Sequence, residues 1–117
     1  MAMATIEECR AALEKLSDNM RGAEGDVGAA AALERSVSCH ITDLGITFAG
    51  RMTGGRLVVD ETLPGPPRER AQIRLAMAGD DLLALVDGKL HFATAWGQGR
   101  VRLEAGLLDL FRLRKLL

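Results

Sequence analysis

The sequence predicts an α+β fold in which helices cover a five-stranded, largely antiparallel sheet. Four segments between residues 36 and 104 alternate between two sets of side chains, a period of two that is typical of strands with one buried face, and a fifth, apolar segment follows a hairpin signal. Segments near both ends repeat apolar residues at helical spacing instead. With 117 residues the chain can bury one hydrophobic core, so residues 1–117 are expected to form a single domain.

Composition and charge limit the class of protein. Apolar residues make up 48% of the chain and charged residues 26%, as in an ordinary globular domain. The net charge of −1 gives no broad attraction for nucleic acid, and no run of about 18 apolar residues would span a membrane. No signal-peptide pattern opens the chain, so a cytoplasmic protein is expected, and its Arg-, Ala- and Leu-rich composition is typical of a GC-rich bacterium.

An N-terminal helix is expected at about residues 5–20. Thr5 and Glu8 have the spacing of a capping box, in which each side chain accepts a hydrogen bond from the other's backbone N–H. Glycines at positions 22 and 25 then end the helix. Residues 21–35 are read as a connector, either with a short Ala-rich helix from Val27 to about Glu34 or as a loosely held segment. The apolar positions of the first helix are Ile6, Cys9, Leu13, Leu16 and Met20.

Three strands are expected after the connector. Val37, Cys39 and Ile41 alternate with polar residues from position 36, and a second alternating stretch covers residues 46–49. Gly54-Gly55 is a two-residue hairpin signal, after which residues 57–59 form the third strand. Residues 63–70 contain three prolines, which lack the N–H that a strand donates, so a loop is expected there.

The remaining elements alternate between strand and helix. A fourth strand is expected at residues 71–77, a helix at 81–87 stopped by Gly88, and a short helix at 91–98. A fifth strand covers residues 100–104, and Gly106 opens a final helix at 107–117. That helix is apolar over nearly half of its circumference, more than one sheet face can cover. Its apolar face comprises Leu107, Leu110, Phe111, Leu113 and Leu117.

No catalytic or metal-binding constellation is visible. His40 and His91 have no acidic or cysteine companion at ligand spacing, and Ser36 and Ser38 lack the strand-turn-helix setting of a nucleophile elbow. Residues 97–100 begin like a phosphate loop, but the third glycine is missing and a strand follows. The two cysteines are far apart and are expected to be reduced thiols. The sequence therefore predicts a protein that is not an enzyme and needs no cofactor or metal.

A specific order of motifs runs from Asp81 to Leu103. An acidic residue opens a Leu-rich helix that ends in Gly-Lys-Leu at 88–90, an aromatic side chain stands at Trp96, and Gln98-Gly99 precedes a basic strand. Together with the Leu-rich final helix, this order resembles the sterol carrier protein type 2 family over about residues 37–117. The resemblance implies a sheet covered by helices, with an apolar tunnel that the C-terminal helix closes.

The resemblance also implies a ligand and its contacts. Relatives of this type carry a fatty acid, a fatty acyl-coenzyme A, a phospholipid or a sterol-like lipid in the tunnel. By position, Trp96 with Phe92 would form an aromatic wall, and Gln98 would be the polar residue at the tunnel. Ordinary core packing explains the two aromatic residues equally well. The remaining ligand-binding residues implied by the resemblance are Leu103, Leu107, Leu110 and Phe111.

The energetic cost of an empty tunnel keeps a second function open. An empty pocket of ~300 Å³ would cost about 7 kcal/mol at ~24 cal/mol per Å³. This cost rivals the total stability of about 5–15 kcal/mol expected for a small domain. The tunnel is therefore expected to be occupied, collapsed or completed by a second chain. Lipid binding without catalysis is the leading interpretation, and a protein-interaction or homodimeric accessory module that uses the same C-terminal helix is the alternative.

Overall fold

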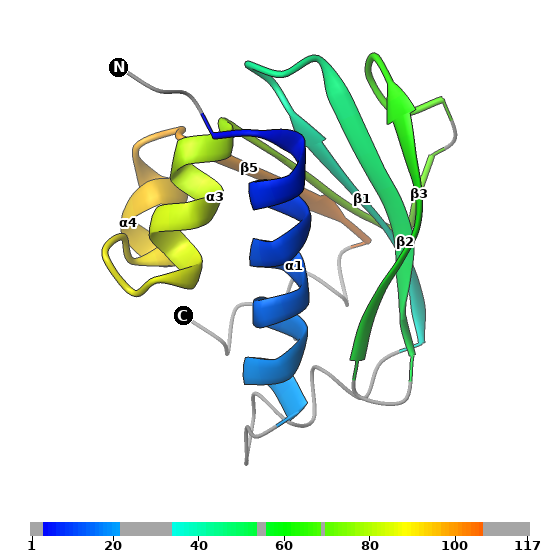
Figure 1. The fold of residues 1–117 in the computed structure, drawn as a ribbon, viewed down its shortest axis with the longest axis horizontal. Helices are drawn as coiled ribbons and strands as arrows, with labels where there is room; N and C mark the ends of the chain where they lie inside the picture. The colour runs from blue at the N-terminus through cyan, green and yellow to red at the C-terminus, as the bar shows by residue number, and fades with distance from the viewer. Residues whose placement is uncertain (1–3, 22–33, 54–55, 69, 107–117) are drawn as a thin grey trace.

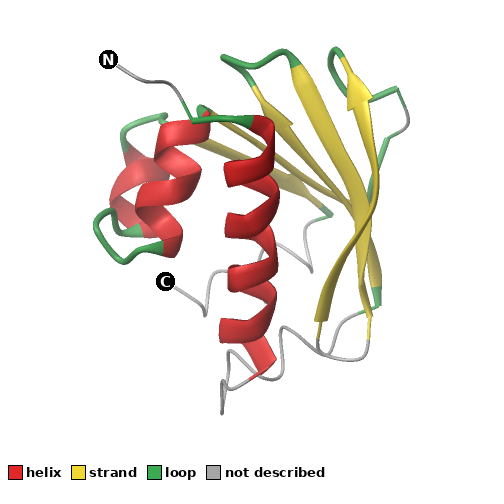
Figure 2. Cartoon of the chain, in the orientation of Figure 1, coloured by secondary structure: helices red, strands yellow, loops and turns green. Residues whose placement is uncertain are grey.

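The fold, seen in a computed structural model, is a five-stranded sheet with helices packed on one face (Figures 1 and 2). The structure describes residues 4–21, 34–53, 56–68 and 70–106. None of the helices in these ranges is both long and apolar enough to cross a membrane. The elements are α1 (Ile6–Arg21), β1 (Arg35–Ile41), β2 (Ile46–Thr53), β3 (Arg56–Pro64), β4 (Ile73–Met77), α3 (Gly79–Val86), α4 (Phe92–Gly97) and β5 (Val101–Ala105).

The sheet has the strand order β3-β2-β1-β4-β5 and is mixed. Three of its neighbouring pairs are antiparallel, but β1 and β4 in the middle are parallel. The prediction of a largely antiparallel sheet therefore needs a correction at its centre. The reason is the long connection after β3, because it carries the chain from one edge of the sheet past β2 and β1, and a strand reached by such a crossover can run parallel to its neighbour.

The strand register places the apolar side chains on one face of the sheet. Cys39 on β1 lies opposite Phe48 on β2 and Leu75 on β4, and Leu75 lies opposite Leu103 on β5. Directly paired residues share a face, so these side chains form one apolar row across four strands. Helices α1 and α3 lie on this side (Figure 1), and we call it the inner face.

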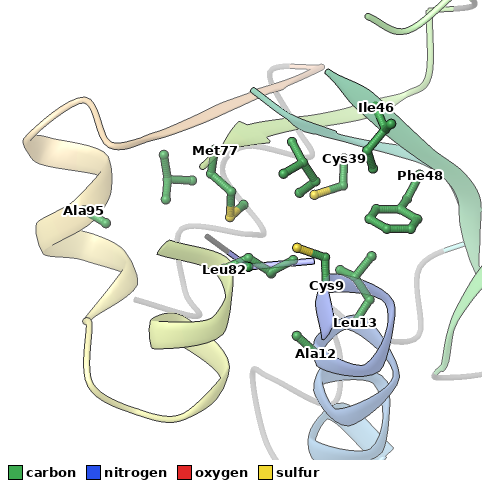
Figure 3. Packing of buried hydrophobic residues seen from close by; sticks show 12 residues of the cluster. Cys9, Ala12, Leu13, Cys39, Ile46, Phe48, Met77, Leu82 and Ala95 are labelled. Carbon is green, nitrogen blue, oxygen red and sulfur yellow. The ribbon is translucent and has the colours of Figure 1, made fainter. Parts of the chain in front are cut away.

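Helix α1 begins with the predicted capping box. The backbone N–H of Thr5 donates to Glu8 Oε1 at 3.1 Å, and the N–H of Glu8 donates to Thr5 Oγ1 at 3.1 Å. The apolar side of the helix then packs on the inner face, where Cys9, Ala12 and Leu13 are buried (Figure 3). The capping-box spacing thus predicted where α1 starts, and the helical spacing of apolar residues predicted which side of the helix is buried.

The starts of helices α1 and α3 are held together by a close approach and by a hydrogen bond from a backbone N–H to a carboxylate. A Cβ added to Gly79 would lie 3.1 Å from the Cys9 sulfur and 3.1 Å from the Ala4 methyl group, so a larger residue at the start of α3 would force these neighbours to shift by a few tenths of an ångström. Asp80 accepts a hydrogen bond at 3.0 Å from the Ala4 N–H, and Asp43 accepts one at 2.9 Å from the Gly79 N–H. These contacts tie both helices to the turn after β1.

Several predicted boundaries are corrected. The prolines were expected to exclude residues 63 and 64 from a strand, but β3 continues to Pro64, which lies opposite Ile46. Because β3 is an edge strand, an N–H that is missing on the edge without a neighbouring strand costs no hydrogen bond of the sheet. Strand β2 extends to Thr53, and α3 starts at Gly79 rather than after it. The expected helix at 107–117 and the Gly54-Gly55 turn lie outside the described residues, as does the expected helix at 27–34 apart from its last residue, Glu34, which is not helical.

Candidate functional site

The inner face carries two clusters of buried apolar side chains. The first is covered by helices, and we call it the helix-covered cluster (Figure 3). The second consists of Val37, Met52 and Ile73, and we call it the strand-only cluster. Among the described residues, the apolar side chains packed around the second cluster also come from strands. The helix-covered cluster comprises Ala4, Cys9, Ala12, Leu13, Cys39, Ile41, Ile46, Phe48, Met77, Leu82, Ala95 and Val101.

The predicted aromatic pair lies on α4, at the border of the helix-covered cluster. Phe92 and Trp96 are four residues apart, so they lie on the same side of the helix. Their ring centroids are 6.1 Å apart, with an angle of 52° between the ring planes. Phe92 packs against the cluster, and both rings are partly exposed. The structure therefore brings these two predicted residues together and leaves part of each ring accessible.

Gln98 lies at the end of the same helix but points to no interior site. It is the residue that caps α4, its backbone N–H donates to the Thr94 carbonyl at 3.0 Å, and it is exposed. Gly99 follows with φ at +77°, the left-handed conformation that glycine adopts at helix ends. In this part of the chain, the Gln-Gly sequence ends a helix and turns the chain into β5.

Leu103 lies on the inner face of β5, next to the strand-only cluster. It is half-buried and packs against that cluster together with Leu57 and Ala105. Leu103 is therefore assigned to a different cluster from Phe92. The other predicted ligand-binding residues, Leu107, Leu110 and Phe111, lie outside the described residues, as does the helix expected to close a tunnel.

Two free thiols occupy the helix-covered cluster. Cys9 on α1 and Cys39 on β1 are both buried, and Figure 3 shows them between the helix and the sheet. Burial, together with the nearby carboxylates of Asp43, Glu8 and Asp80, raises the pKa of the Cys9 thiol from 9.0 to about 11. Burial, together with the neighbouring Cys9, raises the pKa of Cys39 to about 12. Both side chains are therefore neutral and weakly nucleophilic near pH 7.

The described residues offer no metal site, because no group of three His, Cys, Asp or Glu side chains converges among them. His40 has a structural contact instead. Its Nδ1 lies 3.0 Å from the Ile46 carbonyl oxygen and 3.2 Å from Thr47 Oγ1, so it links β1 to β2.

A cavity of about 410 Å³ lies on the other face of the sheet, which we call the outer face. Sequence reasoning missed it, although two of its residues, Ser36 and Ser38, had been considered and set aside as catalytic candidates. The available signal was the presence of small side chains at Ser36, Ser38 and Ala49 on two neighbouring strands, followed along the chain by a proline-rich connection. The cavity is lined by Ser36, Val37, Ser38, Thr47, Ala49, Gly50, Glu61, Leu63, Pro67, Arg68, Arg70 and Ala71.

Comparison with solved structures identifies the fold. It is similar to Sterol Carrier Protein 2 Like 2 from Aedes aegypti, with a TM-score of 0.62 and 12% identity over 97% of this chain and 100% of that one. That mosquito protein has also been solved in a palmitated form. A crystal structure of sterol carrier protein 2 has a TM-score of 0.58 and 16% identity, and the match covers 87% of this chain and 80% of that one. The predicted resemblance is thus confirmed at the level of the fold.

The same fold also matches part of a much longer enzyme. The stereoselective inverting sec-alkylsulfatase Pisa1 from Pseudomonas sp. matches with a TM-score of 0.57 and 20% identity over 89% of this chain. The match spans 16% of the length of the sulfatase chain. At the sequence level, no family model and no curated protein matches. The comparisons therefore show a fold that occurs both as a separate carrier and as part of a larger chain.

Proposed function

We propose that this protein binds a hydrophobic ligand on the inner face of its sheet, without catalysing a reaction on it. The ligand class is a fatty acid, a fatty acyl-coenzyme A, a phospholipid or a sterol-like lipid. The observation that carries the proposal is the strand-only cluster, where the partly buried apolar side chains described around three buried ones all come from strands. The ligand would supply apolar contacts at this end of the inner face.

The position of the cluster supports this role. Ala105 is the last residue of β5 and lies opposite Ile73, so the chain leaves the sheet next to the strand-only cluster. The segment that follows contains Leu107, Leu110 and Phe111. We propose that these side chains, with Leu103, enclose the ligand against the sheet, and that the accessible sides of Phe92 and Trp96 form part of the same apolar lining.

The fold comparisons support the ligand class. The similar mosquito protein is a sterol carrier protein by name and has a palmitated form. A palmitate chain is also a reasonable energetic match, because burying each CH₂ group contributes about 0.8 kcal/mol. A chain of that length would therefore offset much of the cost of opening an apolar space on a small domain.

The test uses delipidated full-length protein and a fluorescent fatty acyl probe. Trp96 is the only tryptophan, so energy transfer from it reports on the probe at one position. We expect saturable transfer that unlabelled palmitate competes away. Leu103→Asp should weaken binding at least about tenfold, because a charge then lies against the acyl chain. Val58→Asp is the matched control on the outer face and should bind as the wild type does.

The alternative is a protein-interaction or homodimeric accessory module. The match to a small part of an alkylsulfatase supports this alternative, because there the fold is one part of a larger chain. Native mass spectrometry distinguishes the two functions. A monomer mass with one added lipid supports the proposal. A dimer without lipid, together with an absence of saturable probe binding, would support the accessory module and contradict the proposal.

A further inference from the structure

The cavity on the outer face is built by small side chains in the middle of the sheet. Ser38 on β1 lies opposite Ala49 on β2, and Ala49 lies opposite Glu61 on β3. On the other side of Ser38 is Arg74, which is occupied by hydrogen bonds to the Ala71 carbonyl and to Glu104. The row therefore has two short side chains between longer charged ones, and this difference in length creates a hollow over β1 and β2.

The connection between β3 and β4 forms the roof of this hollow. It is attached at both ends to outer-face side chains. At one end Thr47 Oγ1 donates to the Gly65 carbonyl at 2.8 Å. At the other end Ser36 and Gln72 exchange two hydrogen bonds, with N–H groups donating to Ser36 Oγ at 2.9 Å and to Gln72 Oε1 at 3.0 Å. The roof is thereby fixed over the strands, which is consistent with the burial of Thr47 and Ser38.

Ser38 provides an unused hydrogen-bonding group inside the cavity. The residue is 3% exposed and lines the cavity. Its Oγ is the buried side-chain polar atom for which no hydrogen-bond partner is found among the described residues. A buried hydroxyl without a partner costs free energy, so a ligand group that reaches Ser38 would gain a hydrogen bond that the protein does not supply.

The rim of the cavity carries charges that are free to bind a ligand. Arg68 and Arg70 on the roof and Glu61 on β3 line it. Among the residues described, no ion pair or hydrogen bond involves the side chain of any of these three. The rim therefore has a net positive charge, with two guanidinium groups and one carboxylate. Between rim and floor, the apolar lining comes from Ala49, Leu63, Pro67 and Ala71.

We propose that this outer-face cavity is a second binding site, distinct from the inner face, for a small organic anion. Its anionic group pairs with Arg68 and Arg70, its apolar body contacts Ala49 and Leu63, and a hydroxyl or amide at its inner end hydrogen-bonds to Ser38. The volume of about 410 Å³ is within the range of small-molecule sites. Its two arginines on the rim and the unpartnered Ser38 hydroxyl on the floor favour a compact acid with a polar group at its other end.

The test is a titration of ¹⁵N-labelled full-length protein at pH 7 with 4-hydroxyphenylacetate, which carries a carboxylate, a ring and a distal hydroxyl. We expect saturable shifts of the amides of Ser38, Thr47 and Ala71, with a Kd of about 1 mM or tighter for a ligand of this size. Phenyl phosphate and phenylacetate, compared with each other, show which anionic group the arginines prefer. The neutral 4-hydroxyphenylacetamide should bind about tenfold more weakly or not at all.

Variants separate the parts of the site. Arg68→Gln with Arg70→Gln should weaken 4-hydroxyphenylacetate at least about tenfold, whereas Arg56→Gln, an exposed arginine outside the lining, should not. Ser38→Ala should weaken it about three- to tenfold but leave phenylacetate unchanged. Ala49→Leu fills the cavity and should abolish binding, while the NMR spectrum of the variant stays that of a folded protein.

Three results would overturn the proposal. The first is the absence of saturable shifts at the cavity with any of the probes. The second is unchanged binding in the double arginine variant. The third is competition by palmitate, since this would place the probe on the inner face. Because palmitate binding is measured separately through Trp96, failure of the outer site and failure of the inner site are distinguishable.

Discussion

The two clusters of the inner face differ in what covers them. The helix-covered cluster has α1, α3 and α4 over it, and its Ile41 and Cys9 side chains are fully buried. The strand-only cluster has three buried residues, and the apolar side chains described around it stay partly exposed. The first cluster holds the described helices against the sheet, and the second is where we propose that a ligand contacts the same face.

Phe48→Ala should have the largest effect on stability. Phe48 is 2% exposed, is paired with Cys39 across β1 and β2, and belongs to the helix-covered cluster (Figure 3). Removing a buried phenyl ring costs about 3–5 kcal/mol, because the packed surroundings do not fill the space. Urea unfolding measures the loss, and Val58→Ala on the outer face should cost about 1 kcal/mol or less. Equal losses in the two variants would contradict the assignment of this cluster as the stabilising one.

High pH should reduce stability through the two thiols of the same cluster. Their folded pKa values of about 11 and about 12 lie above 9.0, so the folded state keeps the protons that the unfolded chain releases. This stabilising contribution is complete below pH 9 and is lost as pH rises toward these folded values. Each thiol then contributes a loss of about 1.4 kcal/mol per pH unit.

Urea unfolding at pH 8, 9 and 10 measures this loss, and the double variant Cys9→Ala with Cys39→Ala is the control. The variant will be less stable at pH 8, but its stability should fall less steeply with pH. If both proteins lose stability at the same rate above pH 9, other groups control the pH dependence and the thiols are not the cause.

Thr5→Ala should have the smallest effect. Loss of the capping hydrogen bond to the Glu8 N–H costs about 1 kcal/mol. The helix that frays is the one that carries Cys9, so labelling of this thiol by a thiol reagent should become faster. Thr94→Ala makes the same chemical change at an exposed position inside α4 and should leave the labelling rate unchanged. An equal increase in both variants would mean that the N-terminal turn of α1 does not protect Cys9.

Local patterns in the sequence predicted those structural features that depend on residues close together in the chain. The capping box at Thr5 and Glu8, the left-handed Gly88 and the alternation along β1 all follow from interactions within a few positions, and the structure confirms them. The motifs from residue 81 onward predicted the fold, which the structural matches confirm. Among the site residues, Phe92 and Trp96 lie together because helical spacing places them on one side of α4, and their expected contact with a ligand stays a prediction.

Features that depend on distant segments were predicted less well. The parallel pairing of β1 and β4 depends on where the connection crosses the sheet, and nothing in the two strands themselves specifies it. The length of β3 depends on its place at the edge. The outer cavity depends on Ser38 and Ala49 lying side by side, which requires the register of β1 and β2. For Leu107, Leu110 and Phe111 the expected contact with a ligand stays a prediction.

The parallel pairing of β1 and β4 also has a consequence for how the molecule is assembled. Strands β1 to β3 form one contiguous antiparallel unit, and β4, α3, α4 and β5 form another, so the sheet joins two consecutive halves of the chain along a single line. Each half has mostly local contacts and can form quickly, whereas the joint between them waits for the slower closure of the connection. The outer cavity lies beside this joint, with its floor on the first half and its roof on the segment between the halves. A ligand there would hold the connecting segment against the first half, and so would favour the chain arrangement from which β4 pairs with β1.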